Sequence, residues 1–337
     1  MADSPLPKDD PTPSRGLRPP DALDGFLRAG RADMLARLGA SFATLGRPGH
    51  AANIYENALQ GYRASNDRPA EALTLINLGM AYAELGAPYK ALDAFREAER
   101  LYRLLSDRRG EATALCCSGL IYDQLEKYED ALAHYEPAIA TLWDIGERAM
   151  EADALDLAGI DHRRLGRLRE AERAHQAALR IRLALHDKPG EAATRHALGV
   201  TYQTMRDYDR AVTSYEWALR LRQGLGDRAG EALTSYNLGK LYESLGYLQE
   251  AELLLARVVA IESKLAHPDV MKDESTLSDV RERRRQAGLE APSRDTSSYQ
   301  RPDLELLDDT QPTPRPPTGT FERPILLKPD EDESEQK

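Results

Sequence analysis

Apolar side chains follow one another at helical spacing along most of the chain. Leu75, Leu78, Tyr82 and Leu85 advance by three or four residues, as on one face of an α-helix. Glycine, alanine and aromatic or equivalent positions recur every 40 residues. These positions are Gly39, Gly79, Gly119, Gly159, Gly199 and Gly239; Ala51, Ala91, Ala131, Ala171, Ala211 and Ala251; and Tyr55, Phe95, Tyr135, His175, Tyr215 and Leu255. The pattern predicts an all-α fold of six tandem helix pairs over residues 31–270, each unit stable only against its neighbours.

The repeated small residues predict how the helices of one unit meet. Glycine and alanine allow two helix backbones to approach closely, and the large residue of the facing column fills the space between them. A turn is predicted after each first helix, with glycine in four units and another residue in two. These turn positions are Gly46, Gly86, Glu126, Gly166, Arg206 and Gly246.

Acidic residues recur at the junction between one unit and the next. Asp67, Asp107, Asp187 and Asp227 occupy this position, and Glu147 stands there once. An acid at a helix start accepts hydrogen bonds from free backbone N–H groups and complements the helix dipole. We therefore expect these five residues to cap the first helices of their units.

The segments that flank the repeats differ from them in composition. Residues 1–20 are rich in proline and are predicted to be disordered, and residues 21–30 are predicted to form a short leading helix. Residues 271–288 carry one thin apolar stripe and are predicted to form a capping helix. Residues 289–337 are acidic and proline-rich, and are predicted to be a disordered tail. Four arginines of the capping helix are expected to face water: Arg281, Arg283, Arg284 and Arg285.

Charge and hydropathy narrow the class of partner. The formal net charge is −11, whereas a nucleic-acid-binding surface is normally basic. No run of about 18 apolar residues exists, and the stretch Met1–Pro7 lacks the apolar core of a secretory signal. We expect a cytoplasmic protein that binds neither nucleic acid nor a membrane. Cys116 and Cys117 are adjacent, so we expect buried, inert thiols rather than a disulfide.

Residues that could carry catalysis are scattered. The seven histidines form no pair at metal-ligand spacing, and no serine or cysteine is matched with a histidine and an acid. His175 stands in the aromatic packing column and is expected in the core. We expect no enzymatic activity, no metal and no cofactor.

Arg163, Arg164, Arg167 and Arg169 form a basic cluster in the fourth unit. Two interpretations stay open at this stage. The cluster is either an exposed surface with helical partners such as Glu170, or part of a binding site.

The repeat resembles that of the tetratricopeptide family, in its longer 40-residue form. One unit carries the family pattern at Leu78, Gly79, Tyr82, Ala91, Phe95 and Ala98. The long form is similar to the repeats of spindle-orientation adaptors and of Rap-type peptide-sensing regulators. The resemblance implies a right-handed superhelical solenoid whose first helices line a concave groove for a protein or peptide partner.

The resemblance also selects groove positions at set offsets from each repeat glycine. It implies that an asparagine two places before the glycine bonds the ligand backbone, and Asn77 and Asn237 match that position. The groove is expected to be apolar toward its N-terminal half and polar toward its C-terminal half. The selected residues are Leu73, Ile76, Asn77, Met80, Asp123, Gln124, Asp153, Asp156, Arg163, Arg164, His196, Gln203, Tyr236, Asn237, Lys240 and Glu243, with Leu120 and Thr204 at equivalent positions.

Two functions are compatible with such a groove. The leading hypothesis is an adaptor or scaffold that binds a partner peptide or helix. The alternative is a sensory regulator whose superhelix changes pitch when a peptide binds. Three leucines of the acidic tail, Leu304, Leu306 and Leu307, are further predicted to contact the groove within the same chain.

Overall fold

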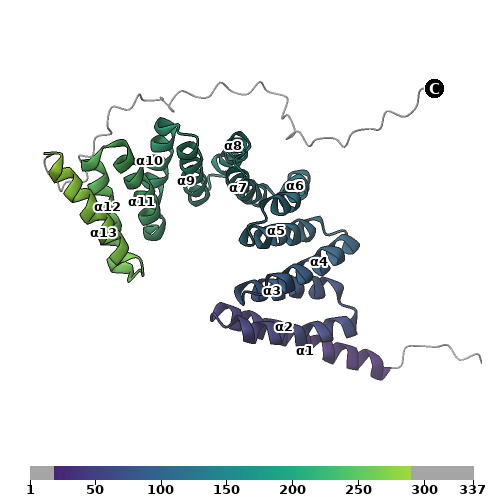
Figure 1. Cartoon of the computed structure of the whole chain (residues 1–337). Coiled ribbons are helices and arrows are strands. Elements are labelled where there is room, and N and C mark those ends of the chain that lie inside the picture. The colour runs from purple at the N-terminus through teal and green to yellow at the C-terminus, as the bar shows by residue number, and fades with distance from the viewer. Residues whose placement is uncertain (1–18, 290–337) are drawn as a thin grey trace, which may run out of the picture. The chain divides into compact units, whose positions relative to one another are not determined.

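The computed structural model describes residues 19–289, with side chains from residue 30 onward, and this part of the chain contains thirteen helices and no strand (Figure 1). The helices are α1 (Pro19–Thr44), α2 (Pro48–Ser65), α3 (Arg68–Glu84), α4 (Pro88–Leu105), α5 (Arg108–Gln124), α6 (Tyr128–Ile145), α7 (Arg148–Arg164), α8 (Leu168–Ala184), α9 (Lys188–Thr204), α10 (Tyr208–Leu225), α11 (Arg228–Leu245), α12 (Leu248–Leu265) and α13 (Val270–Gln286). The all-α prediction is confirmed. The predictions for residues 1–18 and for the tail, with Leu304, Leu306 and Leu307, lie outside the described residues.

Each helix packs against the next one along the chain, and the odd-numbered helices α1 to α11 are the first helices of the units (Figure 1). First helices of neighbouring units also contact one another, as α3 does α5 and α7 does α9. Among the described residues, no two second helices (even-numbered, α2 to α12) approach each other as closely. The first helices therefore lie on the inner side of the array, where a groove is expected.

The repeat glycines lie directly against the rings of the facing column. A Cβ atom at Gly79 would stand 2.4 Å from the Phe95 ring, and one at Gly159 would stand 2.6 Å from His175. His175 itself is fully buried. The predicted close approach of the two helices, and the place of His175 in the core, are confirmed. At Gly239 the space is wider, since the nearest atom of Leu255 would be 3.2 Å away.

Four of the five predicted helix caps are present. Asp67, Asp107, Asp187 and Asp227 accept a hydrogen bond from the backbone N–H three residues on. The prediction is wrong for Glu147, whose side chain makes no such bond, because the longer side chain pairs with Arg109 instead. The pattern also missed Asp207, which caps the second helix α10.

The turns between the two helices of a unit share one backbone geometry. Gly86 has a φ of 69°, and Glu126 and Arg206 have φ values of 59° and 63° in the equivalent positions. In each case the helix closes with a bond from the following residue back to the last turn, as from Lys127 N to Tyr122 O at 2.9 Å. Glu126 and Arg206 therefore hold a left-handed conformation that glycine adopts without strain.

The two ends of the array differ from their predicted form. The proposed leading helix is continuous with the first repeat helix, because α1 runs unbroken from Pro19 to Thr44. At the other end α13 buries Leu277 and Val280. Arg284 does not face water as predicted: it is 9% exposed, and its Nε donates to Glu252 at 2.7 Å. Arg281 donates to the other oxygen of the same carboxylate at 2.9 Å.

Candidate partner-binding surface

Exposed apolar side chains gather on the first helices of the N-terminal units. Leu73 and Met80 of α3 are 57% and 51% exposed, and Leu120 of α5 is 38% exposed. Asn77 lies between the first two on α3, half-buried and without a hydrogen-bond partner among the described residues. Ile76 was selected by the same offsets, but it is 6% exposed and belongs to the hydrophobic core. It is therefore a packing residue.

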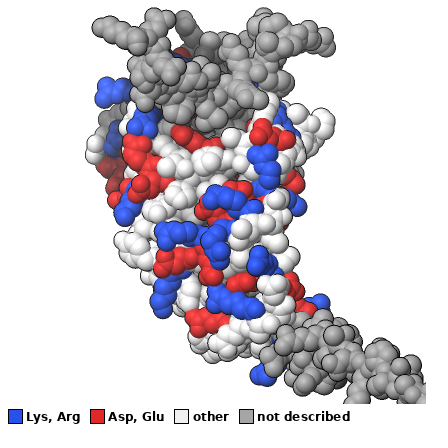
Figure 2. Space-filling view, turned by 90° about the vertical axis from the view of Figure 1, so that its right-hand side faces the viewer, with Lys and Arg blue, Asp and Glu red and all other residues white. Residues whose placement is uncertain are grey.

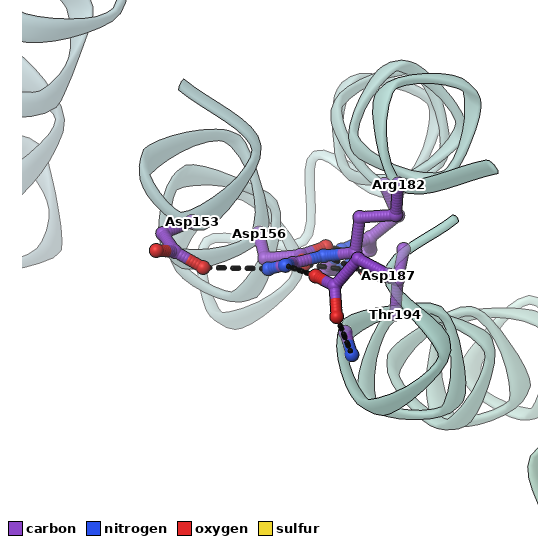
Figure 3. A network of polar contacts seen from close by, with 7 residues as sticks. Asp153, Asp156, Arg182, Asp187 and Thr194 are labelled. Carbon is purple, nitrogen blue, oxygen red and sulfur yellow. Dashed lines mark hydrogen bonds and ion pairs between the residues drawn. The ribbon is translucent and has the colours of Figure 1, made fainter. Parts of the chain in front are cut away.

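The polar residues expected in the C-terminal half are largely bound to other parts of the protein. Asp153 and Asp156 of α7 both accept from Arg182, which reaches across from α8 (Figure 3). Asp156 also accepts from Thr194 of α9 at 2.6 Å and lies 3.0 Å from His175 Nδ1. These two aspartates hold three helices together. Asp156 is bound on both oxygens, whereas Asp153 bonds Arg182 through one oxygen and its side chain stays 64% exposed.

His196 and Asn237 also bond to each other across two units. Asn237 Nδ2 lies 3.2 Å from His196 Nε2, and His196 Nδ1 lies 3.3 Å from Thr234 Oγ1. Burial, reinforced by the positive charge of Arg222, lowers the pKa of His196 to about 4. His196 is therefore neutral at pH 7, accepting from Asn237 and donating to Thr234.

Lys240 and Glu243 are engaged in the same way. Lys240 Nζ is 2.5 Å from Glu243 Oε2, and Arg283 of α13 donates to the other Glu243 oxygen at 2.6 Å. Gln203 accepts from the Tyr215 hydroxyl at 2.9 Å. The sixth unit thus uses its predicted groove charges to hold the last helix in place.

The basic cluster divides into three paired arginines and one without a partner. Arg164 donates to the Tyr128 hydroxyl at 3.0 Å, Arg167 bonds Glu129, and Arg169 pairs with Glu172. All three are exposed, but only Arg169 has a partner on its own helix, because Tyr128 and Glu129 belong to α6 of the preceding unit. Figure 2 shows the same interleaving of basic and acidic side chains over one face of the molecule.

Arg163 is different. It lies half-buried near the end of α7, and its guanidinium has no hydrogen bond or ion pair among the described residues. Burial, together with the charge of Arg164, lowers the pKa of Arg163. A partly desolvated cation without a counter-charge is energetically costly.

A buried acid of the same helix was not selected from the sequence. Asp161 of α7 is 1% exposed, and neither carboxylate oxygen has a hydrogen-bond partner among the described residues. Burial, and then the neighbouring Asp123, raise the pKa of Asp161 to about 8. The sequence did offer one sign of this buried acid. Asp161 stands at a repeat position that holds Ala81, Ile121 and Leu241 in other units.

Of the residues selected from the sequence, seven carry side chains without an assigned internal polar bond or a place in the core among residues 30–289. They are Leu73, Asn77, Met80, Leu120, Gln124, Arg163 and Tyr236. The surface that combines them on α3, α5, α7 and α11 is called the first-helix surface below.

The two cysteines are half-buried, less than the full burial predicted for them. Cys116 and Cys117 are free, and burial raises their pKa values to about 12 and about 11. Within residues 19–289 no cluster of histidine, cysteine and acidic side chains has the makings of a metal site. None of the described helices combines the length and the apolar character needed to cross a bilayer.

The sequence matches models of a known protein family. A tetratricopeptide repeat model matches residues 30–104 and 150–224, and a second model of the same description matches residues 233–264. Together these matches cover more than half of the 337 residues. The chain belongs to the tetratricopeptide repeat family.

Solved structures share the fold at low sequence identity. BtubC (BKLC) from P. vanneervenii has a TM-score of 0.56 at 22% identity, over 73% of this chain and 92% of that one. The apo form of RapI has a TM-score of 0.57 at 13% identity, over 71% and 85%. A Rap protein complexed with competence and sporulation factor has a TM-score of 0.53 at 17% identity, over 76% of each chain. No curated protein matches the sequence significantly.

Proposed function

We propose that this protein is an interaction scaffold that binds a segment of a partner protein on the first-helix surface. The observation that carries the proposal is Arg163, a half-buried guanidinium without a counter-charge among the described residues. Membership of the tetratricopeptide repeat family, whose members are typically interaction scaffolds, supports a binding role rather than a catalytic one.

The chemistry of this surface defines the ligand that fits it. Leu73, Met80 and Leu120 offer exposed apolar contacts, and Asn77 offers an amide without a partner in the described part of the chain. A carboxylate on Arg163 forms a charge-assisted, two-pronged pair that a lysine in its place cannot form. The best ligand is therefore a segment with apolar side chains on one side and an aspartate or glutamate that reaches α7.

A random peptide library displayed against the full-length chain tests this proposal, because the selection requires no identified partner. Selected peptides should combine apolar and acidic residues. Their affinity should fall about tenfold or more in Arg163→Gln, the loss of one charge-assisted contact. Leu73→Ser with Met80→Ser should weaken binding through the apolar contacts.

The matched control is Arg173→Gln, which removes the same charge from an exposed position on α8. Peptides that bind all variants equally, or that respond only to Arg173, would place the binding surface elsewhere and overturn the proposal.

The alternative of a peptide-responsive regulator rests on the likeness to the Rap structures. This alternative differs from the scaffold proposal in one respect: the array changes shape when the peptide binds. Small-angle scattering of the full chain, with and without a selected peptide, separates the two roles. An unchanged radius of gyration favours the rigid scaffold, and a shorter array with bound peptide favours the regulator.

A further inference from the structure

Two buried arginines occupy equivalent positions in neighbouring units. Arg182 of α8 and Arg222 of α10 are 40 residues apart, and each is 8% exposed. Each donates to a threonine 12 residues further on: Arg182 to Thr194 at 3.1 Å, and Arg222 to Thr234 at 2.5 Å. The repeat therefore places an arginine at the same junction in two neighbouring units. The surroundings of Arg182 and Arg222 can be compared directly.

Arg182 is fully neutralised by carboxylates (Figure 3). Its Nη1 donates to Asp187 at 2.7 Å. Its Nη2 donates to Asp153 at 2.7 Å and to Asp156 at 3.2 Å. Three acids from three sequence positions surround one cation, as expected of a buried charge in a stable protein.

Arg222 lacks two of these three acids. Asp187 has its counterpart in Asp227, which stands 3.8 Å from Arg222 Nε. Where the fourth unit has Asp153 and Asp156, the fifth has Ala193 and His196. Arg222 Nη1 donates to Gly230 O at 2.6 Å, whereas its Nη2 has no partner among the described residues.

His196 does not replace the missing carboxylate. It is neutral at pH 7, and its two ring nitrogens already face Thr234 and Asn237. The positive charge of Arg222 contributes to lowering the pKa of His196, and burial lowers the pKa of Arg222 itself. The fifth unit therefore contains a buried cation with a single distant counter-charge.

The position that would hold the missing carboxylate is open to solvent. The Asp153 side chain is 64% exposed while it bonds Arg182, so this corner of the guanidinium can be reached from outside. The equivalent residue, Ala193, is exposed and fills the position with only a methyl group. A carboxylate brought by another molecule can therefore approach Arg222 over Ala193, along the direction that Asp153 takes in the fourth unit.

We propose that Arg222 is a second recognition point for the partner, and that it binds an aspartate or glutamate side chain which enters over Ala193 and takes the place that Asp153 holds one unit earlier. This inference rests on the proposed function for the source of the carboxylate, a segment bound to the first-helix surface. The ligand then carries two acidic residues, one for Arg163 and one for Arg222.

The test is to supply the missing carboxylate within the chain. Ala193→Asp should raise the melting temperature of the full-length protein by about 2 °C or more, as a newly paired buried cation does in a domain of this size. Ala193→Asn, of the same shape without charge, should not. In the Arg222→Gln background the two substitutions should become equivalent.

A small probe then tests binding from solution. N-acetyl-aspartate amide at about 50 mM should raise the melting temperature of the wild-type chain, because a ligand that binds only the folded state stabilises it. At matched ionic strength the asparagine analogue should have no effect. Arg222→Gln and Ala193→Asp should each abolish the response to the aspartate probe.

Equal melting temperatures of Ala193→Asp and Ala193→Asn, or equal responses of the wild type and Arg222→Gln to the probe, would overturn the inference. These readouts do not involve Arg163 or the apolar residues of α3. Library peptides that depend on Arg163 but not on Arg222 would therefore refute this second point alone, and a probe response without any selected peptide would refute the scaffold proposal alone.

Discussion

The two halves of the array use different side chains for the contacts between neighbouring units. In α1 to α6 the second-helix position that faces the next unit holds Tyr62, Tyr102 and Leu142, and Glu71 is the one buried charged residue of the described part of this half. In α8 and α10 the same position holds Arg182 and Arg222. From α7 onward the buried charged side chains are Glu151, Asp161, Glu172, Arg182, Glu191, Glu216, Arg222, Glu231, Glu252, Glu262, Asp273 and Arg284.

The difference shows that the repeat geometry tolerates either kind of contact between units, but under different conditions. An apolar contact needs only volume and shape, and neighbouring residues can adjust to it. A buried charge needs a partner at hydrogen-bonding distance, and a missing partner leaves a large unfavourable term. The two contacts proposed above for a ligand, at Arg163 and Arg222, therefore both lie in the C-terminal half, where a counter-charge is missing.

The largest loss of stability is expected at the repeat glycines, which both halves share. Gly79→Leu in the first half and Gly159→Leu in the second drive a side chain into Phe95 and His175, and each should cost about 3 kcal/mol or more through overpacking. Urea unfolding followed by helical circular dichroism measures the loss. Gly239→Ala is the control and should stay within about 1 kcal/mol of the wild type, because the space is wider and alanine favours a helix. A loss confined to one half would contradict a shared geometry.

A smaller difference in stability is expected between variants of the two buried arginines. Arg182→Gln leaves three carboxylates around an uncharged side chain and should cost about 3 kcal/mol. Arg222→Gln loses hydrogen bonds but strands no close carboxylate, and should cost about 1 kcal/mol. The same unfolding experiment compares them, and equal losses would mean that the surroundings of the two arginines are equivalent after all.

The pH dependence of stability should report the buried acid of the second half. The pKa of Asp161 is raised by burial from 3.8 to about 8, so the folded protein keeps a proton that the unfolded chain releases. The stability from this proton is complete below about pH 4 and is lost as the pH rises to about 8. As the pH rises over this range, the free energy of unfolding of Asp161→Asn should therefore increase relative to that of the wild type, by at most about 1.4 kcal/mol per pH unit.

Urea titrations at several pH values between about 5 and 9 provide the measurement. Asp279→Asn, at an exposed position on α13, is the control and should run parallel to the wild type. Parallel curves for Asp161→Asn as well would show that the Asp161 carboxyl is ionised in the folded protein.

The smallest effect concerns the turns between the two helices of a unit, where each half of the array has one non-glycine residue with a positive φ. Glu126→Gly and Arg206→Gly should each stabilise the protein by about 0.5 kcal/mol, because glycine relieves the left-handed φ but loses more entropy on folding. Gly86→Ala, at the equivalent turn, should destabilise it by about 1 kcal/mol. Differential scanning calorimetry resolves the order of these variants, and a destabilised Glu126→Gly would indicate a role for the glutamate side chain.

Sequence reasoning was most successful where the information was local or repeated. The approach of Gly79 to Phe95 and the cap at Asp107 followed from residue type and the 40-residue spacing. It was less successful for the candidate surface. Arg163 and Arg164 are neighbours of the same type, yet only Arg164 finds Tyr128 and Asp123, because consecutive residues on a helix point in different directions.

The sequence alone determined that the chain is a helical repeat, because the period, the small residues and the caps are each written many times over and any one of them can fail without changing the fold. Only the tertiary structure decided which charges remain available to a partner. Asp153 and Arg163 were equally good candidates in the sequence, but Arg182 occupies the first and nothing in the described chain occupies the second. That outcome depends on a few ångströms between side chains of different helices, 29 residues apart for Asp153 and Arg182, which no local pattern encodes.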